Sequence, residues 1–220
     1  MLDFARARRN MVDNQLRTFD VTDRAILAAM ADVPRERFVP PARAGLAYLD
    51  QNVNLSGPGE EPRWALQPMV LARMLQALEI DAGARALDVA TGYGYAAQVL
   101  SVLGADVVAL DSSPTLTEEA ARRLEASSPP VTVRTGELKE GCAGDGPFDM
   151  ILLNGAVETR PDGLLRQLKD GGRLACLLRE GAAGHAVLFV RAGDGFGSRR
   201  LFDAAAPVLP GFAAERVFEF

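Results

Sequence analysis

Residues 84–178 alternate between short apolar runs and amphipathic segments, and this alternation constrains the fold more than any other feature of the sequence. The apolar runs have strand length and the segments between them have helix length, which predicts an α/β fold with a doubly wound, mainly parallel sheet. The expected strands are 85–90, 106–111, 131–135, 148–153 and 172–178, and the expected helices are 94–103, 115–126 and 161–168. Two later runs of strand character, 185–193 and 212–220, suit an antiparallel edge.

The first 80 residues show helical patterns and no alternation of strands with helices. Helical patterns cover 3–17, 22–31 and 67–78, the second of them after a cap at Thr22 or Asp20. The stretch "LDQNVNLSGPGEEPRW" is rich in Gly, Pro, Asn and charge, which predicts a long loop of the kind that is often functional. We therefore expect a helical N-terminal cap with a substrate loop in residues 1–80 and a ligand-binding α/β domain in residues 81–220.

Charge, apolar segments and cysteine spacing limit the kinds of partner and ligand that we expect the protein to bind. The formal net charge of −5 gives no global basic field that would recruit nucleic acid or an anionic membrane. No segment approaches the roughly 20 apolar residues of a membrane span, and the N-terminus lacks an apolar signal region, so we expect a cytoplasmic protein. Cys142 and Cys176 have neither CxxC nor Cys/His spacing, which predicts no metal site and no disulfide framework.

Ligands of doubly wound sheets bind at the carboxyl ends of the strands, and the first strand-to-helix turn here is "DVATGYGY", residues 88–95. Gly92 and Gly94 permit a tight turn and a close ligand approach. Asp88 lies in an apolar run, where a buried carboxylate is costly unless something binds it. The spacing Gly92-x-Gly94-x-x-Ala97, with Asp111 after the next strand, also fits a dinucleotide-binding fingerprint.

Asp88 separates these interpretations. A carboxylate at this place would repel a pyrophosphate, whereas S-adenosylmethionine carries an ammonium and a sulfonium and no phosphate. We therefore favour S-adenosylmethionine over a nicotinamide dinucleotide as the cofactor. A third interpretation is an ordinary packed turn in which Asp88 caps the helix.

Six segments make the sequence similar to the protein-L-isoaspartate O-methyltransferase family. In chain order they are "AMADVPRERFVPP", "AYLD", "LQPMVLARML", "LDVATGYGYAAQVL", "GPFDMILLNGAVE" and "LLRQLKDGGRLACLL". The resemblance implies a Rossmann-like class I methyltransferase fold with a helical N-terminal cap. It also implies protein repair, by methyl transfer from S-adenosylmethionine to the carboxylate of isoaspartyl residues in a peptide or protein.

The resemblance places one group of residues on the family's cofactor loop, which usually opens acidic-x-Gly-Thr-Gly-x-Gly. The residues are Asp88, Ala90, Thr91, Gly92, Tyr93 and Gly94. Ala90 replaces the first glycine, which we expect to be tolerated if its φ stays negative.

Further cofactor residues follow from the same resemblance. Asp111 matches the acidic residue that holds the ribose hydroxyls, with Ser112 beside it, and Gly136-Glu137 stands where the family has Gly-Asp near the adenine. Asn154 is expected to be either a polar group at the pocket rim or a turn residue.

The acceptor loop departs from the family, in which it reads roughly Gly-x-x-Ile-Ser-x-Pro. The matching stretch is "PRWALQP", so Leu66 takes the place of the serine whose hydroxyl helps to hold the accepting carboxylate. Arg63 either clamps an anion or is solvated, and Trp64 either stacks on an acceptor or packs in the core. Gln67 is retained. Arg63, Leu66, Gln67 and Thr91 are our candidates for the acceptor side.

Methyl transfer needs no general base, because an isoaspartyl carboxylate is ionised at neutral pH and the sulfonium donor is activated. The sole histidine, His185, is therefore expected to be structural. Because Leu66 offers no hydrogen bond, we expect weak isoaspartyl activity. Two alternatives stay open: methylation of a different acceptor, such as a small molecule, and a cofactor-binding regulator without transfer activity.

Overall fold

A seven-stranded sheet forms the centre of the molecule in the computed structural model, which describes residues 3–181 and 183–214. The strand order is β5-β4-β3-β6-β7-β8-β9. The first five of these strands are parallel, and β8 and β9 continue the sheet antiparallel. The strands are β3 (Arg85–Val89), β4 (Asp106–Asp111), β5 (Val131–Thr135), β6 (Phe148–Val157), β7 (Leu168–Glu180), β8 (Ala183–Ala192) and β9 (Gly195–Asp203). The expected doubly wound, mainly parallel α/β fold is confirmed.

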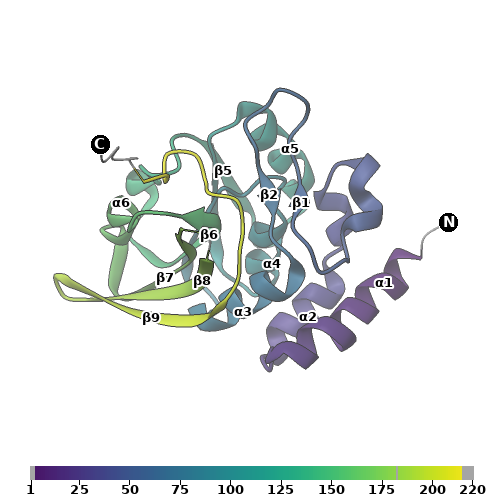
Figure 1. Cartoon of the computed structure of the whole chain (residues 1–220), viewed down its shortest axis with the longest axis horizontal. Helices are drawn as coiled ribbons and strands as arrows, with labels where there is room; N and C mark the ends of the chain where they lie inside the picture. The colour runs from purple at the N-terminus through teal and green to yellow at the C-terminus, as the bar shows by residue number, and fades with distance from the viewer. Residues whose placement is uncertain (1–2, 182, 215–220) are drawn as a thin grey trace.

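Helices cover both faces of this sheet (Figure 1). They are α1 (Phe4–Met11), α2 (Arg24–Asp32), α3 (Pro68–Leu78), α4 (Tyr95–Val102), α5 (Pro114–Leu124) and α6 (Asp162–Leu165). Neighbouring strand residues point to opposite faces, so Ala86 packs in the core that includes α1 to α5, and Leu87 packs in the core that includes α6.

The helical N-terminal segment packs against α3 and α4, which cover one face of the sheet. Met11 and Ile26 are buried in the same apolar core as Ala86. The helix expected over 3–17 is shorter: α1 ends at Met11, and the chain continues through a π turn and a 3₁₀ turn to Phe19. The cap of α2 is Asp23, not Thr22 or Asp20, and its Oδ1 accepts from the N–H groups of residues 25 and 26.

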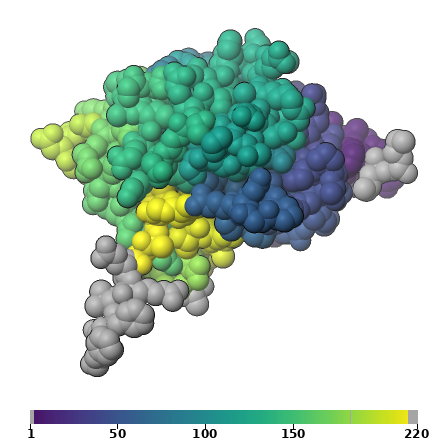
Figure 2. Space-filling model, turned by 90° about the horizontal axis from the view of Figure 1, so that it is seen from above, coloured from purple at the N-terminus to yellow at the C-terminus, as the bar shows by residue number. Residues whose placement is uncertain are grey.

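The expected long loop contains a small hairpin. β1 (Val53–Asn54) pairs antiparallel with β2 (Trp64–Ala65), and we call residues 53–65 the hairpin. It stands above the carboxyl ends of the central strands (Figure 1). Figure 2 shows it beside the yellow segment that follows β9, and Asn52 Nδ2 donates to the Ala205 carbonyl at 3.2 Å.

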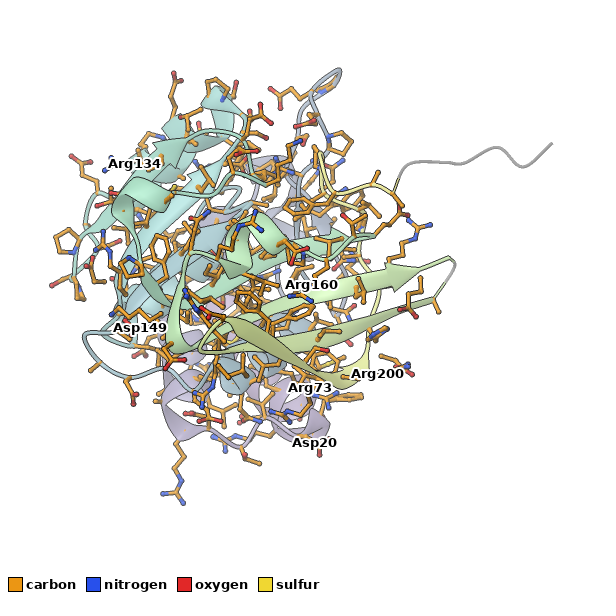
Figure 3. The ribbon with its side chains drawn as sticks, turned by 90° about the vertical axis from the view of Figure 1, so that its left-hand side faces the viewer. Asp20, Arg73, Arg134, Asp149, Arg160 and Arg200 are labelled. Atoms are coloured by element: carbon orange, nitrogen blue, oxygen red, sulfur yellow. The ribbon has the colours of Figure 1, made fainter. Side chains whose placement is uncertain are left out.

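The antiparallel edge differs from expectation in one strand. The run 212–220 was expected to pair, but residues 212–214 are irregular, and 215–220 lie outside the described residues. The edge strand is β9, whose side chains are mostly exposed, so its sequence carries little apolar signal. Arg73 of α3 fixes this edge by placing its guanidinium 3.9 Å from the Phe202 ring, and Figure 3 shows Arg73 near Arg200 and Asp20.

The interior of the sheet also departs from the expected boundaries. β6 runs to Val157, four residues beyond its expected end, and β7 begins at Leu168, inside the expected helix 161–168, of which only α6 forms. Both cysteines are free thiols. Within residues 3–181 and 183–214, no helix is long and apolar enough to cross a membrane, and no group of three potential metal ligands occurs.

Candidate functional site

The glycine-rich turn lies where β3 ends, at the point at which the strand order reverses between β4 and β6. Gly92 and Gly94 have φ of 57° and 89°, so both use the left-handed freedom of glycine. Ala90 also has a positive φ, 59°, so the condition under which we expected alanine to be tolerated at this position is not met. An L-residue in this conformation costs roughly 1–2 kcal/mol, so the family's glycine suits the backbone here better than alanine does.

Asp88 is fully buried, and two side chains meet its carboxylate. Thr91 Oγ1 donates to Oδ2 at 2.6 Å, and Asn154 Nδ2 donates to Oδ1 at 2.6 Å. Burial nevertheless raises the pKa of Asp88 to about 6. Asn154 is therefore not a turn residue: it lies inside β6, reaches Asp88 on the neighbouring strand and lines the pocket beside the turn.

Asp111 ends β4 and is bound on two sides. Gly92 N–H donates to its Oδ2 at 2.9 Å, which ties the turn to the neighbouring strand. On the other side Arg63 of the hairpin donates Nε to both carboxylate oxygens, at 3.2 and 3.0 Å, and Nη2 to Oδ1 at 2.9 Å. Arg63 Nη2 also reaches Ser112 Oγ at 3.0 Å. Both side chains of the ion pair are 0% exposed, so Arg63 is an anion clamp whose anion is the protein's own carboxylate.

Leu55 brings the hairpin against the glycine turn as well. A methyl group built on Gly92 would lie 2.3 Å from Leu55 Cδ1, so the missing side chain of Gly92 accommodates this leucine. The hairpin is braced by the Leu55 N–H, which donates to the Arg63 carbonyl at 2.7 Å, and by the Arg63 N–H, which donates to Ser56 Oγ at 2.7 Å. The hairpin thus lies directly on the two groups that the sequence assigned to the cofactor.

A small cavity of about 20 Å³ remains between the turn, the hairpin and the cap, which is room for about one water molecule. Its lining includes Ala90, Thr91, Tyr93 and Asn154 from the sheet side and Leu66 from the acceptor loop. The structure thus brings the expected cofactor turn and the expected acceptor loop together at one point.

The remaining expected site residues lie around this centre. Gly136 N–H donates to the Asp111 carbonyl at 3.0 Å, which places Gly136 and the exposed Glu137 at the adjoining end of β5. Gln67 caps α3 through its backbone, and its N–H donates to Asn52 Oδ1 at 2.9 Å. His185 lies in β8, paired with Leu178 and Asp203, away from the turn.

The sequence interpretation missed two groups at this site. Leu55 gave no signal, because a single leucine in a polar loop carries no periodicity. Arg35, in the motif "VPRERFVP", is 1% exposed and lines the cavity, and burial lowers the pKa of its guanidinium. A buried arginine cannot be told from a solvated one by residue type alone.

Comparisons with known proteins agree on one family. The family model described as protein-L-isoaspartate(D-aspartate) O-methyltransferase matches residues 6–201. A protein-L-isoaspartate O-methyltransferase of Methylorubrum extorquens is 42% identical over 172 residues, which cover 78% of this chain and 74% of that protein. A protein of the same name from Roseiflexus is 36% identical and covers 98% of both chains.

Solved structures give the same fold. A protein-L-isoaspartate O-methyltransferase structure superposes with a TM-score of 0.80 at 25% identity, covering 93% of this chain and 66% of that one. A Plasmodium falciparum structure, described as a candidate protein-L-isoaspartate O-methyltransferase in complex with S-adenosyl-L-homocysteine, gives a TM-score of 0.77 at 18% identity. It covers 95% of this chain and 99% of that one. The chain belongs to the protein-L-isoaspartate O-methyltransferase family, as its sequence motifs predicted.

Proposed function

We propose that the chain is an S-adenosylmethionine-dependent methyltransferase that acts on isoaspartyl carboxylates of peptides or proteins. The observation that carries this proposal is the pair of buried carboxylates, Asp88 and Asp111, at the carboxyl ends of adjacent strands on either side of a positive-φ glycine turn. Asp111 is suited to accept hydrogen bonds from ribose hydroxyls, and Asp88 gives the amino-acid end of the cofactor a negative charge.

The sheet side of the site fits such a cofactor, but the hairpin side leaves it no space. Arg63 and Leu55 lie on Asp111 and Gly92, and the remaining cavity of about 20 Å³ is far smaller than a nucleoside. Binding therefore requires the hairpin to move away and Arg63 to release Asp111. The free energy needed to break the Arg63–Asp111 ion pair makes the binding free energy of the cofactor less favourable by the same amount.

Bound S-adenosylmethionine supplies an activated methyl group on a sulfonium. The protein's own part is to orient the acceptor carboxylate in line with that methyl group and to keep water out, and well-oriented reactants can gain roughly 7–11 kcal/mol. No proton has to move, so the site needs no general base. Leu66, buried and without a hydroxyl, weakens the hold on the acceptor.

Cofactor binding should depend on the ionisation of Asp88. Because the pKa of Asp88 is about 6 in the free protein, the carboxyl is largely neutral at pH 5 and charged at pH 7. A cationic ligand favours the charged form, so affinity should fall about tenfold between pH 7 and pH 5. Calorimetric titration with S-adenosylhomocysteine at both pH values measures this. Asp88→Asn should bind weakly with a flat profile, and an equally steep profile in that variant would assign the titration to another group.

The direct test of the proposed function is transfer of labelled methyl from S-adenosylmethionine to an isoaspartyl peptide, with the matching aspartyl peptide as control. We expect slow transfer to the isoaspartyl peptide and none to the control. Leu66 favours one further candidate, methylation of a different, less polar acceptor, because an apolar side chain stands where the family has a hydroxyl. Rapid labelling of another acceptor beside an inert isoaspartyl peptide would support that candidate instead.

A further inference from the structure

Two buried polar atoms in residues that line the small cavity make no hydrogen bond of normal geometry among residues 3–181 and 183–214, and their side chains face each other. They are Nη1 of Arg35 and Oη of Tyr95, and both residues line the cavity. Buried donors in folded proteins are almost always satisfied, so an unsatisfied pair that shares one cavity points to a ligand that accepts hydrogen bonds.

Arg35 adds a positive charge to this cavity. Its other nitrogens are used for backbone contacts: Nε donates to the Ala47 carbonyl at 2.8 Å and Nη2 to the Leu66 carbonyl at 2.5 Å. The guanidinium carbon lies 4.6 Å from the centre of the Tyr95 ring. No carboxylate pairs with Arg35 in the part of the chain that the structure describes, and a buried charge without a counterion is costly. An anion is the ligand that would remove this cost.

Tyr95 supplies a second donor of suitable chemistry. It begins α4, directly after the glycine turn, and is 4% exposed. Burial raises the pKa of its hydroxyl to about 12, so the hydroxyl keeps its proton at neutral pH. Together the two side chains present a cation and a neutral O–H donor, the combination that a carboxylate accepts well.

The position of the pair completes the argument. The same cavity is lined by Ala90 and Thr91 of the expected cofactor turn and by Leu66, where the acceptor-binding hydroxyl is missing. We propose that Arg35 Nη1 and Tyr95 Oη bind the methyl-accepting carboxylate, in place of that hydroxyl. This inference rests on the proposed function, and the acceptor reaches both donors when the hairpin opens.

The chemistry sets how Arg35 and Tyr95 contribute. In the transfer a carboxylate oxygen forms the new O–CH₃ bond, the S–CH₃ bond breaks and its electron pair stays on sulfur, and no proton moves. Negative charge on the acceptor is lost along this path, so a cation that binds the carboxylate stabilises the ground state at least as much as the transition state. Loss of either donor should therefore raise KM for the peptide and leave kcat nearly unchanged.

Tyr95→Phe tests this proposal with little structural disturbance, because among the described residues the hydroxyl makes no hydrogen bond of normal geometry and interacts only with the Arg35 guanidinium. In the presence of saturating S-adenosylhomocysteine, a fluorescently labelled isoaspartyl peptide should bind this variant about tenfold more weakly than the natural protein. KM should rise by the same factor. Thermal stability should stay equal or increase, since an unsatisfied buried hydroxyl is removed. A purely structural tyrosine would not lose peptide affinity while keeping stability.

Two further variants complete the experiment. Arg35→Lys keeps the positive charge but loses the planar set of guanidinium donors. It should also lower the affinity for the isoaspartyl peptide without changing the affinity for S-adenosylhomocysteine. Tyr48→Phe is the matched control, because the Tyr48 hydroxyl is bonded to Glu36 and does not line the cavity; it should leave peptide affinity unchanged. Unchanged peptide affinity in both Tyr95→Phe and Arg35→Lys would overturn the inference alone. A natural protein that binds S-adenosylhomocysteine but not the peptide would overturn the proposed function, and the inference with it.

Discussion

Replacing Arg63 by alanine should tighten the binding of S-adenosylhomocysteine at least tenfold. In the natural protein, binding must first break a fully buried ion pair in which Arg63 makes three hydrogen bonds to Asp111. Charge-assisted bonds of this kind contribute about 1.5–3 kcal/mol each, so removing the competitor raises affinity even after some loss of hairpin packing. Calorimetric titration of both proteins at pH 7 measures the change.

The same substitution should destabilise the free protein. Removing one partner of a buried ion pair leaves an uncompensated charge and typically costs about 3–5 kcal/mol, so the melting temperature of Arg63→Ala should fall and S-adenosylhomocysteine should restore more of it than in the natural protein. Arg43→Ala is the matched control: Arg43 also holds the hairpin, by donating to the carbonyls of Asn54 and Ser56, but no carboxylate among the described residues pairs with it. Equal or weaker ligand affinity in Arg63→Ala would show that Arg63 does not compete.

Replacing Leu66 by serine should raise kcat/KM for isoaspartyl peptides by about ten- to a hundredfold. The side chain is 2% exposed, and its backbone carbonyl is held by Arg35, so a serine hydroxyl at this position would face the cavity region with little freedom to turn away. One charge-assisted hydrogen bond to the acceptor carboxylate is worth about 1.5–3 kcal/mol, which corresponds to that factor. The measurement is labelled-methyl transfer to an isoaspartyl peptide.

The affinity for S-adenosylhomocysteine should not change in Leu66→Ser, which separates an acceptor effect from a cofactor effect. Leu66→Ala is the control for lost bulk, and it should stay as slow as the natural protein. If serine and alanine behave alike, the hydroxyl does not reach the carboxylate, and Arg35 and Tyr95 hold it without help.

The parallel part of the fold was predictable because a buried strand leaves a recognisable apolar run in the sequence. β3 and β4 carry continuous apolar runs bounded by turn residues, and the glycine turn follows the first of them. β9 gave no such signal, since an edge strand with exposed side chains needs no apolar pattern. The polar partners of Asp88 could be foreseen only in part: Thr91 is local, whereas Asn154 meets it through the pairing of β3 with β6.

Arg63 illustrates why the site could not be completed from the sequence. Residue type and spacing indicated an anion clamp or a solvated arginine, and they placed Asp111 separately on the cofactor. The two residues are 48 positions apart, and only the path of the hairpin over the sheet brings them together. Ala90 is a similar case, because the sign of its φ follows from the turn geometry around it and not from its identity.

Trp64 offers the most direct test of whether the hairpin and the cofactor exclude each other. It is the sole tryptophan of the chain, lies in β2 next to Arg63 and lines the cavity. Titration of the natural protein with S-adenosylhomocysteine should shift the Trp64 emission to longer wavelength as the hairpin moves into solvent, with a midpoint that matches the calorimetric Kd. Binding by calorimetry with unchanged Trp64 emission, or no binding at all, would contradict the proposal that the cofactor site opens by release of Arg63 from Asp111.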